Sequence, residues 1–456
     1  MHNVANSHYR FLPMKRFFPR AAALLFVVST ALAETAPPLP VVIVKAGHLI
    51  DTAAGVVRNN QAIVIEGDKI KSVGAVDEIM KSPPVGAEII DLGKATVLPG
   101  LIDCHTHVVS QPENYYIDLF RRSPIDVAIT AHVYARRTLE AGFTTIRDVG
   151  AREFVDIALR NAINKGTVAG PRMLVCGPPI GATGGHVDLN GFSPNVRFER
   201  VAPAVADGPD AIRAAVRRNV KYGADWIKII ASAGVLSEEE SVGAPQYSFE
   251  EMKAAVDEAA MWGRKVAAHA HGTEAIKMAI RAGVTSIEHG SLIDDEGIRM
   301  MKERGTWLVA DVYNDDYIIG EYSRLGFPDK MIEKERMVGR QQRENLRKAI
   351  AAGVKVAFGT DAGVYPHGWN AKQFRYMAAA GLTPMQAIQS ATTKAAELIG
   401  WKDKVGQLSP GYFADLIALN ADPIADVTSL ERVDFVMKGG VIYRNGLTAD
   451  PIAVPK

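Results

Sequence analysis

Histidines in this sequence occur in pairs and at the ends of short apolar runs. The run from Leu101 to His107 contains His105 and His107, which the two-residue period of a strand places on one face. Two imidazoles in that arrangement can bind one divalent metal ion. The pair by itself also fits two hydrogen-bonded histidines in a protein core. A metal site therefore needs support from elsewhere in the chain.

Three later apolar runs supply that support. Each ends on side chains that can bind a metal: His269 and His271 together, then His289, and finally Asp361. A buried parallel strand is normally apolar throughout, so this placement is unusual. Imidazole and carboxylate ligands suit zinc, manganese and related divalent ions. We expect a metal site here, with zinc as the metal.

A lysine, Lys228, lies within the otherwise apolar run Trp226–Ile230. Burying a bare ammonium group carries a large desolvation cost. An acidic partner or a place at the edge of the strand would lower that cost. A carbamate formed from Lys228 and CO2 gives a better account, because it converts the cation into an anionic oxygen ligand. Such a ligand can bridge two metal ions, so we expect two.

Apolar runs alternate with amphipathic stretches between about residues 96 and 400. Eight strands are predicted, ending at His107, Asp148, Cys176, Ala231, His271, His289, Val312 and Asp361. Helices are predicted at 209–222, 248–263, 274–283 and 294–305. This order predicts an α/β fold whose natural form at this length is a closed (β/α)8 TIM barrel, with a doubly wound open sheet as the alternative. No GxGxxG motif follows a first strand, so a dinucleotide-binding fold has no support.

Both ends of the chain read as short strands with turn residues between them. We predict a small β-sandwich domain built from 34–95 and 401–456, on either side of a barrel at 96–400. Residues 1–33 read as a signal peptide, because Lys15, Arg16 and Arg20 precede the apolar run Ala21–Ala33. We therefore expect a periplasmic or secreted protein with no membrane span after the signal is removed.

The composition limits the classes of partner. The chain has 456 residues and a formal charge of +1, so no net field favours nucleic acid or an anionic membrane. Its only cysteines, Cys104 and Cys176, lie in apolar runs and are expected to be buried free thiols. We expect a small-molecule substrate and a homo-oligomeric assembly.

The segments 97–107 and 406–416 resemble the opening strand and the closing signature of the amidohydrolase superfamily. The resemblance covers nearly the whole chain after the signal. It implies that His105, His107 and Asp361 bind one metal ion and that His269 and His289 bind the second. It also implies that carbamylated Lys228 bridges the two.

Finer motifs resemble the branch of Xaa-Pro dipeptidases and ochratoxin-hydrolysing enzymes. They are Gly184–His186, Ala268–Gly272, Ile287–Gly290 and Gly381–Pro384. This likeness implies cleavage of an amide bond next to a C-terminal amino acid, in dipeptides or N-acyl amino acids. The run Trp307–Tyr313 and the residue Gln373 depart from the usual pattern, and both leave the substrate preference open.

The predicted mechanism needs no protein nucleophile. A water between two metals has a lowered pKa and attacks the scissile carbonyl as hydroxide. Asp361 takes its proton and passes it to the leaving amine. His271 is assigned to polarising the carbonyl and His186 and Tyr247 to binding the substrate, although for Tyr247 a structural role is the favoured interpretation.

Two other functions remain open at this stage. A deaminase would use the same fold with one metal, but it would not need a bridging carbamate on Lys228. A non-catalytic scaffold would normally have lost metal ligands, and here the full set is present. The number of metals bound per chain separates the three.

Overall fold

The computed structural model describes residues 39–113, 121–196 and 205–448. The predicted signal peptide lies outside these residues. No helix in the described ranges is long and apolar enough to cross a membrane. Cys104 and Cys176 are both buried, and both are free thiols.

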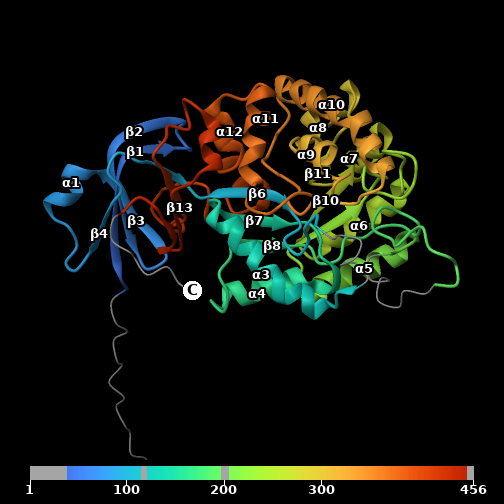
Figure 1. Ribbon diagram of the computed structural model, residues 1–456, viewed down its shortest axis with the longest axis horizontal. Coiled ribbons are helices and arrows are strands. Elements are labelled where there is room, and N and C mark those ends of the chain that lie inside the picture. The colour runs from blue at the N-terminus through green and yellow to red at the C-terminus, as the bar shows by residue number, and fades with distance from the viewer. Residues whose placement is uncertain (1–38, 114–120, 197–204, 449–456) are drawn as a thin grey trace, which may run out of the picture. The chain divides into compact units, whose positions relative to one another are not determined.

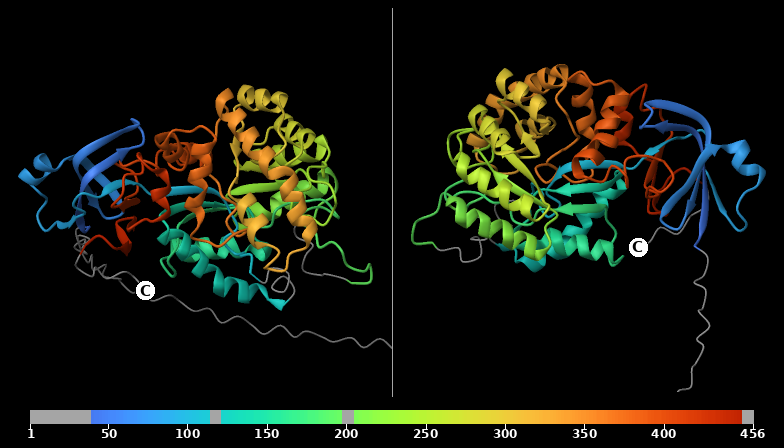
Figure 2. Two further views of the ribbon diagram at one scale, coloured as in Figure 1. Left: turned by 45° about the horizontal axis from the view of Figure 1, so that its top comes forward. Right: turned by 180° about the vertical axis from the view of Figure 1, so that it is seen from behind.

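Strands from the two ends of the described chain form one eight-stranded sheet. Their order is β15-β14-β13-β5-β1-β2-β3, with β4 paired to β1. The bounds are β1 Val41–Asp51, β2 Val56–Glu66, β3 Lys69–Ala75, β4 Glu88–Asp91, β5 Thr96–Pro99, β13 Leu416–Leu419, β14 Phe435–Lys438 and β15 Val441–Asn445. Figure 2 shows the N-terminal blue strands beside the C-terminal red ones.

The two chain ends meet where β5 pairs antiparallel with β13, with Val97 opposite Ala418. On its other side β5 pairs in parallel with β1. The short helix α1 (Val76–Lys81) follows β3 and packs on β2 and β3. The two β-rich ends therefore share one sheet, while the predicted domain boundaries stay a prediction.

The middle of the chain alternates parallel strands with helices. One parallel sheet has the order β6-β7-β8 and another the order β12-β11-β10-β9. Their bounds are β6 Leu101–Thr106, β7 Phe143–Asp148, β8 Arg172–Val175, β9 Trp226–Ile230, β10 Lys265–Ala270, β11 Ser286–His289 and β12 Trp307–Val309. Single parallel bridges join Ile180 to Ile229 and Leu308 to Val356.

Helices surround these parallel strands (Figure 1). They are α3 Pro124–Glu140, α4 Val155–Asn164, α5 Gly208–Tyr222, α6 Phe249–Met261, α7 Thr273–Ala282, α8 Asp295–Arg304, α9 Asn314–Glu321, α10 Asp329–Ala352, α11 Gln373–Ala379, α12 Pro384–Ser390 and α13 Thr393–Ile399. Short 3-10 turns are η1 Arg152–Phe154, η3 Asn370–Lys372 and η4 Val427–Glu431. The four helices predicted between residues 209 and 305 are present as α5 to α8, within one or two residues at most ends.

Local sequence signals explain where these helices begin and end. Ser248 and Glu251 form a reciprocal capping box at the start of α6, and Asp294 caps α8. Gly223, Gly283 and Gly305 end α5, α7 and α8 in the left-handed conformation that glycine adopts without penalty.

The eighth predicted strand differs from expectation. Residues 354–361 form no regular strand, although Thr106 bridges Ala362 beyond them. Their backbone groups bond to three separate segments: Phe358 accepts from Cys104 and donates to Ser390, while Ala357 donates to Leu308. The ladder with β6 is interrupted because the amides of Phe358 and Ile102 donate to Ser390 and Ala391 instead of to each other's segment.

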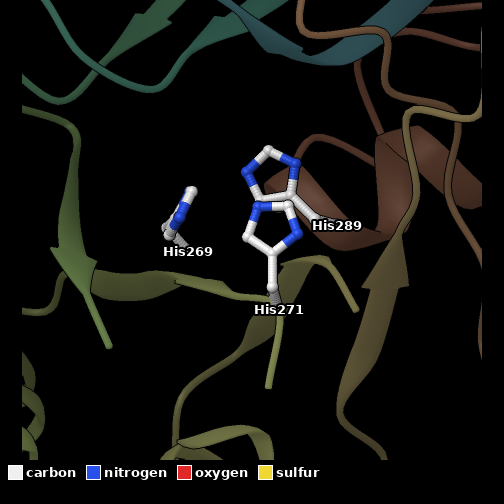
Figure 3. Close-up of side chains that lie close together, drawn as sticks. All are labelled: His269, His271 and His289. Atoms are coloured by element: carbon white, nitrogen blue, oxygen red, sulfur yellow. The ribbon is translucent and has the colours of Figure 1, made fainter. Parts of the chain in front are cut away.

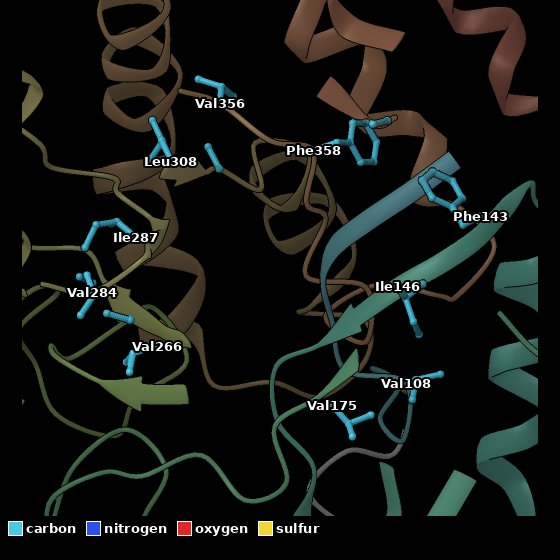
Figure 4. Packing of buried hydrophobic residues seen from close by; sticks show 14 of the residues in the cluster. Val108, Phe143, Ile146, Val175, Val266, Val284, Ile287, Leu308, Val356 and Phe358 are labelled. Atoms are coloured by element: carbon cyan, nitrogen blue, oxygen red, sulfur yellow. The ribbon is translucent and has the colours of Figure 1, made fainter. Parts of the chain in front are cut away.

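The apolar core lies between the parallel strands and their helices. Ile146, Val266, Ile287 and Leu308 belong to one large cluster of buried residues, part of which is seen in Figure 4. A second cluster, which includes Val44, Ile63 and Phe435, lies within the eight-stranded sheet region.

Candidate metal centre

The predicted metal-binding side chains meet in one cavity of about 760 Å³. They reach it from the carboxyl ends of the strands or from the segments just beyond. The lining includes His105, His107, His186, Lys228, His269, His271, His289 and Asp361. Tyr247 is not among the described lining residues; it is buried and its hydroxyl donates to the Ala206 carbonyl over 2.7 Å. Its geometry is that of a packing residue.

His105, His107 and Asp361 form the first group that could hold a metal ion. Asp361 Oδ1 lies 3.3 Å from His105 Nε2 and 3.2 Å from His107 Nε2. The other ring nitrogen of each histidine is occupied: His105 Nδ1 lies 2.9 Å from Glu288 and His107 Nδ1 lies 2.9 Å from the Gly150 carbonyl. Each imidazole therefore turns its Nε2 towards the carboxylate.

His269, His271 and His289 form the second group, in which Figure 3 shows the three rings close together. The His271 and His289 rings stack with centroids 4.5 Å apart, and His269 stands edge-on to both. The resemblance assigned only His269 and His289 to a metal, so the structure brings His271 closer to the ligand set than expected. Its Nδ1 lies 2.8 Å from Ser291 Oγ.

Three buried atoms in these groups lack a hydrogen-bond partner among the described residues. They are His105 Nε2, His269 Nε2 and Asp361 Oδ1; the first and last lie 3.3 Å apart but do not form a hydrogen bond. Most buried polar atoms in proteins have a partner, so an orphaned set in one cavity needs an explanation. Metal coordination satisfies all three, and the donor set of nitrogen and carboxylate oxygen fits zinc.

Lys228 is only 2% exposed and lines the same cavity. The described residues give its side chain no hydrogen bond or ion pair. Burial lowers the pKa of its ammonium group, while Glu288 and Asp361 act in the opposite direction. A neutral amine, the form that reacts with CO2, is therefore favoured here more than at a surface lysine.

Arg147 and Glu288 form a fully buried ion pair behind the first group. Arg147 Nη2 donates to Glu288 Oε1 over 2.8 Å, and both side chains are completely buried. Glu288 Oε2 faces His105 Nδ1, so the pair fixes the orientation of that ring. Despite its burial, the Arg147 and His105 charges hold the pKa of Glu288 well below its usual range. Neither residue was predicted from the sequence. Opposite charges inside two apolar strands were nevertheless a signal for a buried ion pair.

Asp311 plays the corresponding part for His289. Asp311 Oδ1 lies 2.9 Å from His289 Nδ1 and also accepts from Gln342 Nε2 over 3.0 Å. Asn314 Nδ2 donates to Asp311 Oδ2 over 2.6 Å and to Asp361 Oδ2 over 3.3 Å. Partners of this kind orient metal-binding histidines and raise their basicity. The sequence alone did not predict this role for Asp311. The residue was noted only within the run Trp307–Tyr313, which departs from the usual family pattern.

The backbone is strained at two candidate ligands. His289 has φ 69° and Asp361 has φ 57°, in the left-handed region that only a few per cent of non-glycine residues adopt, with Asn, Asp and His the most frequent among them. Such strain persists where the surrounding structure holds it, and it clusters at functional sites. His289 ends β11, Asp361 ends the segment 354–361, and both residues line the cavity.

His186 packs against the second group through His269. Its ring stacks on His269 with centroids 4.2 Å apart, and its Nδ1 lies 2.7 Å from Ser237 Oγ. Ser237 belongs to the loop after β9, whose carbonyls of Gly234, Ser237 and Glu239 all accept from Lys334 Nζ. Lys334 on α10 thus holds the loop that positions His186.

Replacing Lys334 by methionine should loosen this loop. Three carbonyls would lose a charged donor, and we expect the free energy of unfolding to fall by about 1–3 kcal/mol. Thermal melts and limited proteolysis within residues 234–246 measure the effect. Lys330→Met is the matched control, because Lys330 reaches the same loop from a more exposed position. Equal changes in the two variants would contradict the special role of Lys334.

A model of the amidohydrolase family matches residues 96–443. The ochratoxinase of Aspergillus niger is 32% identical over 425 residues, covering 89% of this chain and 87% of the relative. The chain belongs to the amidohydrolase family. It is a hydrolytic enzyme that acts on amide bonds.

Solved structures place this amidohydrolase in the branch predicted from its motifs. A Xaa-Pro dipeptidase with bound methionine in the active site superposes with a TM-score of 0.84 at 41% identity, covering 89% of this chain and all (100%) of that chain. The A. niger ochratoxinase superposes with a TM-score of 0.78 at 31% identity, covering 90% of this chain and 96% of that chain. The predicted resemblance is confirmed.

Gln373 stands where the amidohydrolase pattern often has an acidic residue. Here it is fully buried: its Nε2 donates to the Ala310 carbonyl over 2.5 Å and its Oε1 accepts from the Tyr313 backbone over 3.1 Å. Both contacts hold the segment after β12, which carries Asp311. The side-chain amide of Gln373 therefore helps to position Asp311 by binding the backbone on either side of it.

Proposed function

We propose that this enzyme is a binuclear metal hydrolase that cleaves an amide bond next to a C-terminal amino acid, in dipeptides or N-acyl amino acids. The orphaned atoms of His105, His269 and Asp361 in one cavity carry the proposal. The likeness to a dipeptidase and to an ochratoxinase supports the substrate class. Ochratoxin-like amides fall within that class.

Two zinc ions are proposed to occupy the two groups. His105, His107 and Asp361 would hold the first, His269 and His289 the second, and Lys228 would contribute between them as a carbamate. When bound, such ions lower the pKa of water and polarise a carbonyl oxygen. We also propose that the parallel strands and the segment 354–361 close into a (β/α)8 barrel, supported by the single bridges between them.

The residues of the chain then handle the proton and the substrate. The Asp361 carboxylate, oriented by the contact of Asn314 Nδ2 with Oδ2, would accept a proton from the attacking water and return it to the leaving amine. His271, oriented by Ser291, faces the scissile carbonyl. His186 is proposed to contact the substrate above His269.

A substrate screen combined with a metal count tests this function. The zinc-loaded protein is incubated with dipeptides and N-acyl amino acids, and released amino acids are quantified. Two metals per chain with release of a C-terminal amino acid support the proposal. One metal with release of ammonia would indicate a deaminase, and no metal without turnover would indicate a scaffold; either result contradicts it.

Lys228→Ala tests the carbamate. The variant loses the proposed oxygen ligand, so we expect fewer than two metals per chain and a loss of activity that short-chain carboxylic acids partly restore. In the unaltered protein, ¹³C-labelled CO2 should give a carbamate signal by NMR that the variant lacks. Full activity of Lys228→Ala with two metals bound would contradict a bridging role.

A further inference from the structure

The long helix α10 turns one face towards the metal centre. On this face Gln342 Nε2 contacts Asp311 Oδ1 and the His289 carbonyl, at 3.0 and 3.3 Å. Glu335 precedes Gln342 by seven residues, which is two helical turns, so it lies on the same face about 10 Å away along the axis. The helix therefore presents a carboxyl group at a fixed distance from the candidate ligands.

Glu335 is only 4% exposed, yet it lines the cavity. The described residues give its carboxyl group no hydrogen bond or ion pair. The nearby cation Arg343 is already engaged, lying 3.0 Å from Asp315 and 2.7 Å from Asp316. Burial, followed by the charges of Asp315 and Asp311, raises the pKa of Glu335 to about 8. The free site therefore favours the neutral acid, and a cationic group placed beside Glu335 would favour the carboxylate instead.

The wall around Glu335 is apolar. Val235, Ile318, Tyr322 and Phe327 line the cavity and belong to one buried cluster with residues of α10. A carboxyl group beside such an apolar wall suits a ligand with an aliphatic stem and a charged end.

The position of Glu335 is fixed by helix packing. One turn further along α10, a Cβ atom on Gly339 would lie 2.4 Å from Asp315 Cγ, so α10 and α9 are in close contact there. A recognition group on a rigidly packed helix is placed more accurately than one on a loop.

We propose that Glu335 binds a cationic nitrogen of the substrate, an ammonium or a guanidinium group, while the amide is cleaved at the metal centre. The inference rests on the proposed amide hydrolysis and narrows its substrate class. The nitrogen can belong to a basic side chain or to the free α-amino group of a dipeptide. Both sources offer the same charge-assisted hydrogen bonds to a carboxylate.

Matched substrate pairs distinguish these sources. Ala-Lys against Ala-norleucine and Lys-Ala against norleucine-Ala test a basic side chain on either side of the amide. Ala-norleucine against its N-acetyl form tests the α-amino group. The ratio of kcat/KM within each pair is measured for the unaltered enzyme, for Glu335→Gln and for Glu333→Gln, an exposed glutamate on the same helix.

The unaltered enzyme should prefer the cationic member of at least one pair by about tenfold or more, the scale of a charge-assisted hydrogen bond. Glu335→Gln should remove most of that preference, and Glu333→Gln should keep it. Calorimetry with L-lysine and L-norleucine gives a second readout that needs no turnover. Hydrolysis with no cation preference, or with a preference unchanged in Glu335→Gln, would overturn this inference alone. Failure to hydrolyse any amide would instead contradict the proposed function.

Discussion

Asp361→Asn is expected to lower turnover by roughly 10²- to 10⁴-fold, the range for loss of a general acid–base group. Asparagine keeps the size of the side chain and can still donate to or accept from Asn314. The amide cannot take the proton that the carboxylate is proposed to accept from water. Steady-state kinetics on a cleavable dipeptide measure the loss.

The metal content of Asp361→Asn must be measured alongside its kinetics, because the same side chain is a proposed ligand. Asp210→Asn is the control, since Asp210 is fully exposed on α5. Near-normal turnover of Asp361→Asn with two metals bound would show that another group acts as the base.

Arg147→Met should be strongly destabilising. The substitution leaves the Glu288 carboxylate fully buried without its counter-charge, and removing one partner of such a pair costs about 3–5 kcal/mol of the free energy of unfolding. Thermal and urea melts of metal-free protein measure this loss without a contribution from bound metal. The ring of His105 also loses its fixed partner, so metal affinity should fall as well.

The double variant Arg147→Met, Glu288→Gln tests whether the unpaired Glu288 carboxylate causes the loss of stability. Removing both charges should cost less than the sum of the single changes, because the uncompensated carboxylate is gone. Arg324→Met, which breaks an exposed ion pair with Glu321, should have a much smaller effect. Additive losses at Arg147 and Glu288 would mean that the two residues do not act as a pair.

The candidate ligands were predictable because two simple rules locate them. Strand alternation puts His105 and His107, and likewise His269 and His271, on common faces. Parallel strands then bring their carboxyl ends to one side of the fold. Neither rule requires knowledge of side-chain contacts, and the resulting residues do meet in the cavity.

The supporting residues were less accessible to sequence reasoning. Arg147 and Glu288 are 141 positions apart, and their pairing follows only from the way the strands are arranged. Glu335 and Gln342 line the cavity because α10 packs beside it. The sequence of α10 by itself does not predict this packing. Tyr247 does not line the cavity, because its hydroxyl group donates to the Ala206 carbonyl instead. That tertiary contact also could not be predicted from the local sequence.

The pairing of β5 with β13 has a consequence for how this chain folds during synthesis. The paired residues Val97 and Ala418 are about 320 positions apart. At roughly 5–20 residues per second, a ribosome needs about 15–65 s to make the intervening chain. During that time β1, β2, β3 and β5 can assemble, but one edge of β5 stays without its partner. Exposed strand edges promote aggregation, so the nascent protein should depend on chaperones until its last strands emerge.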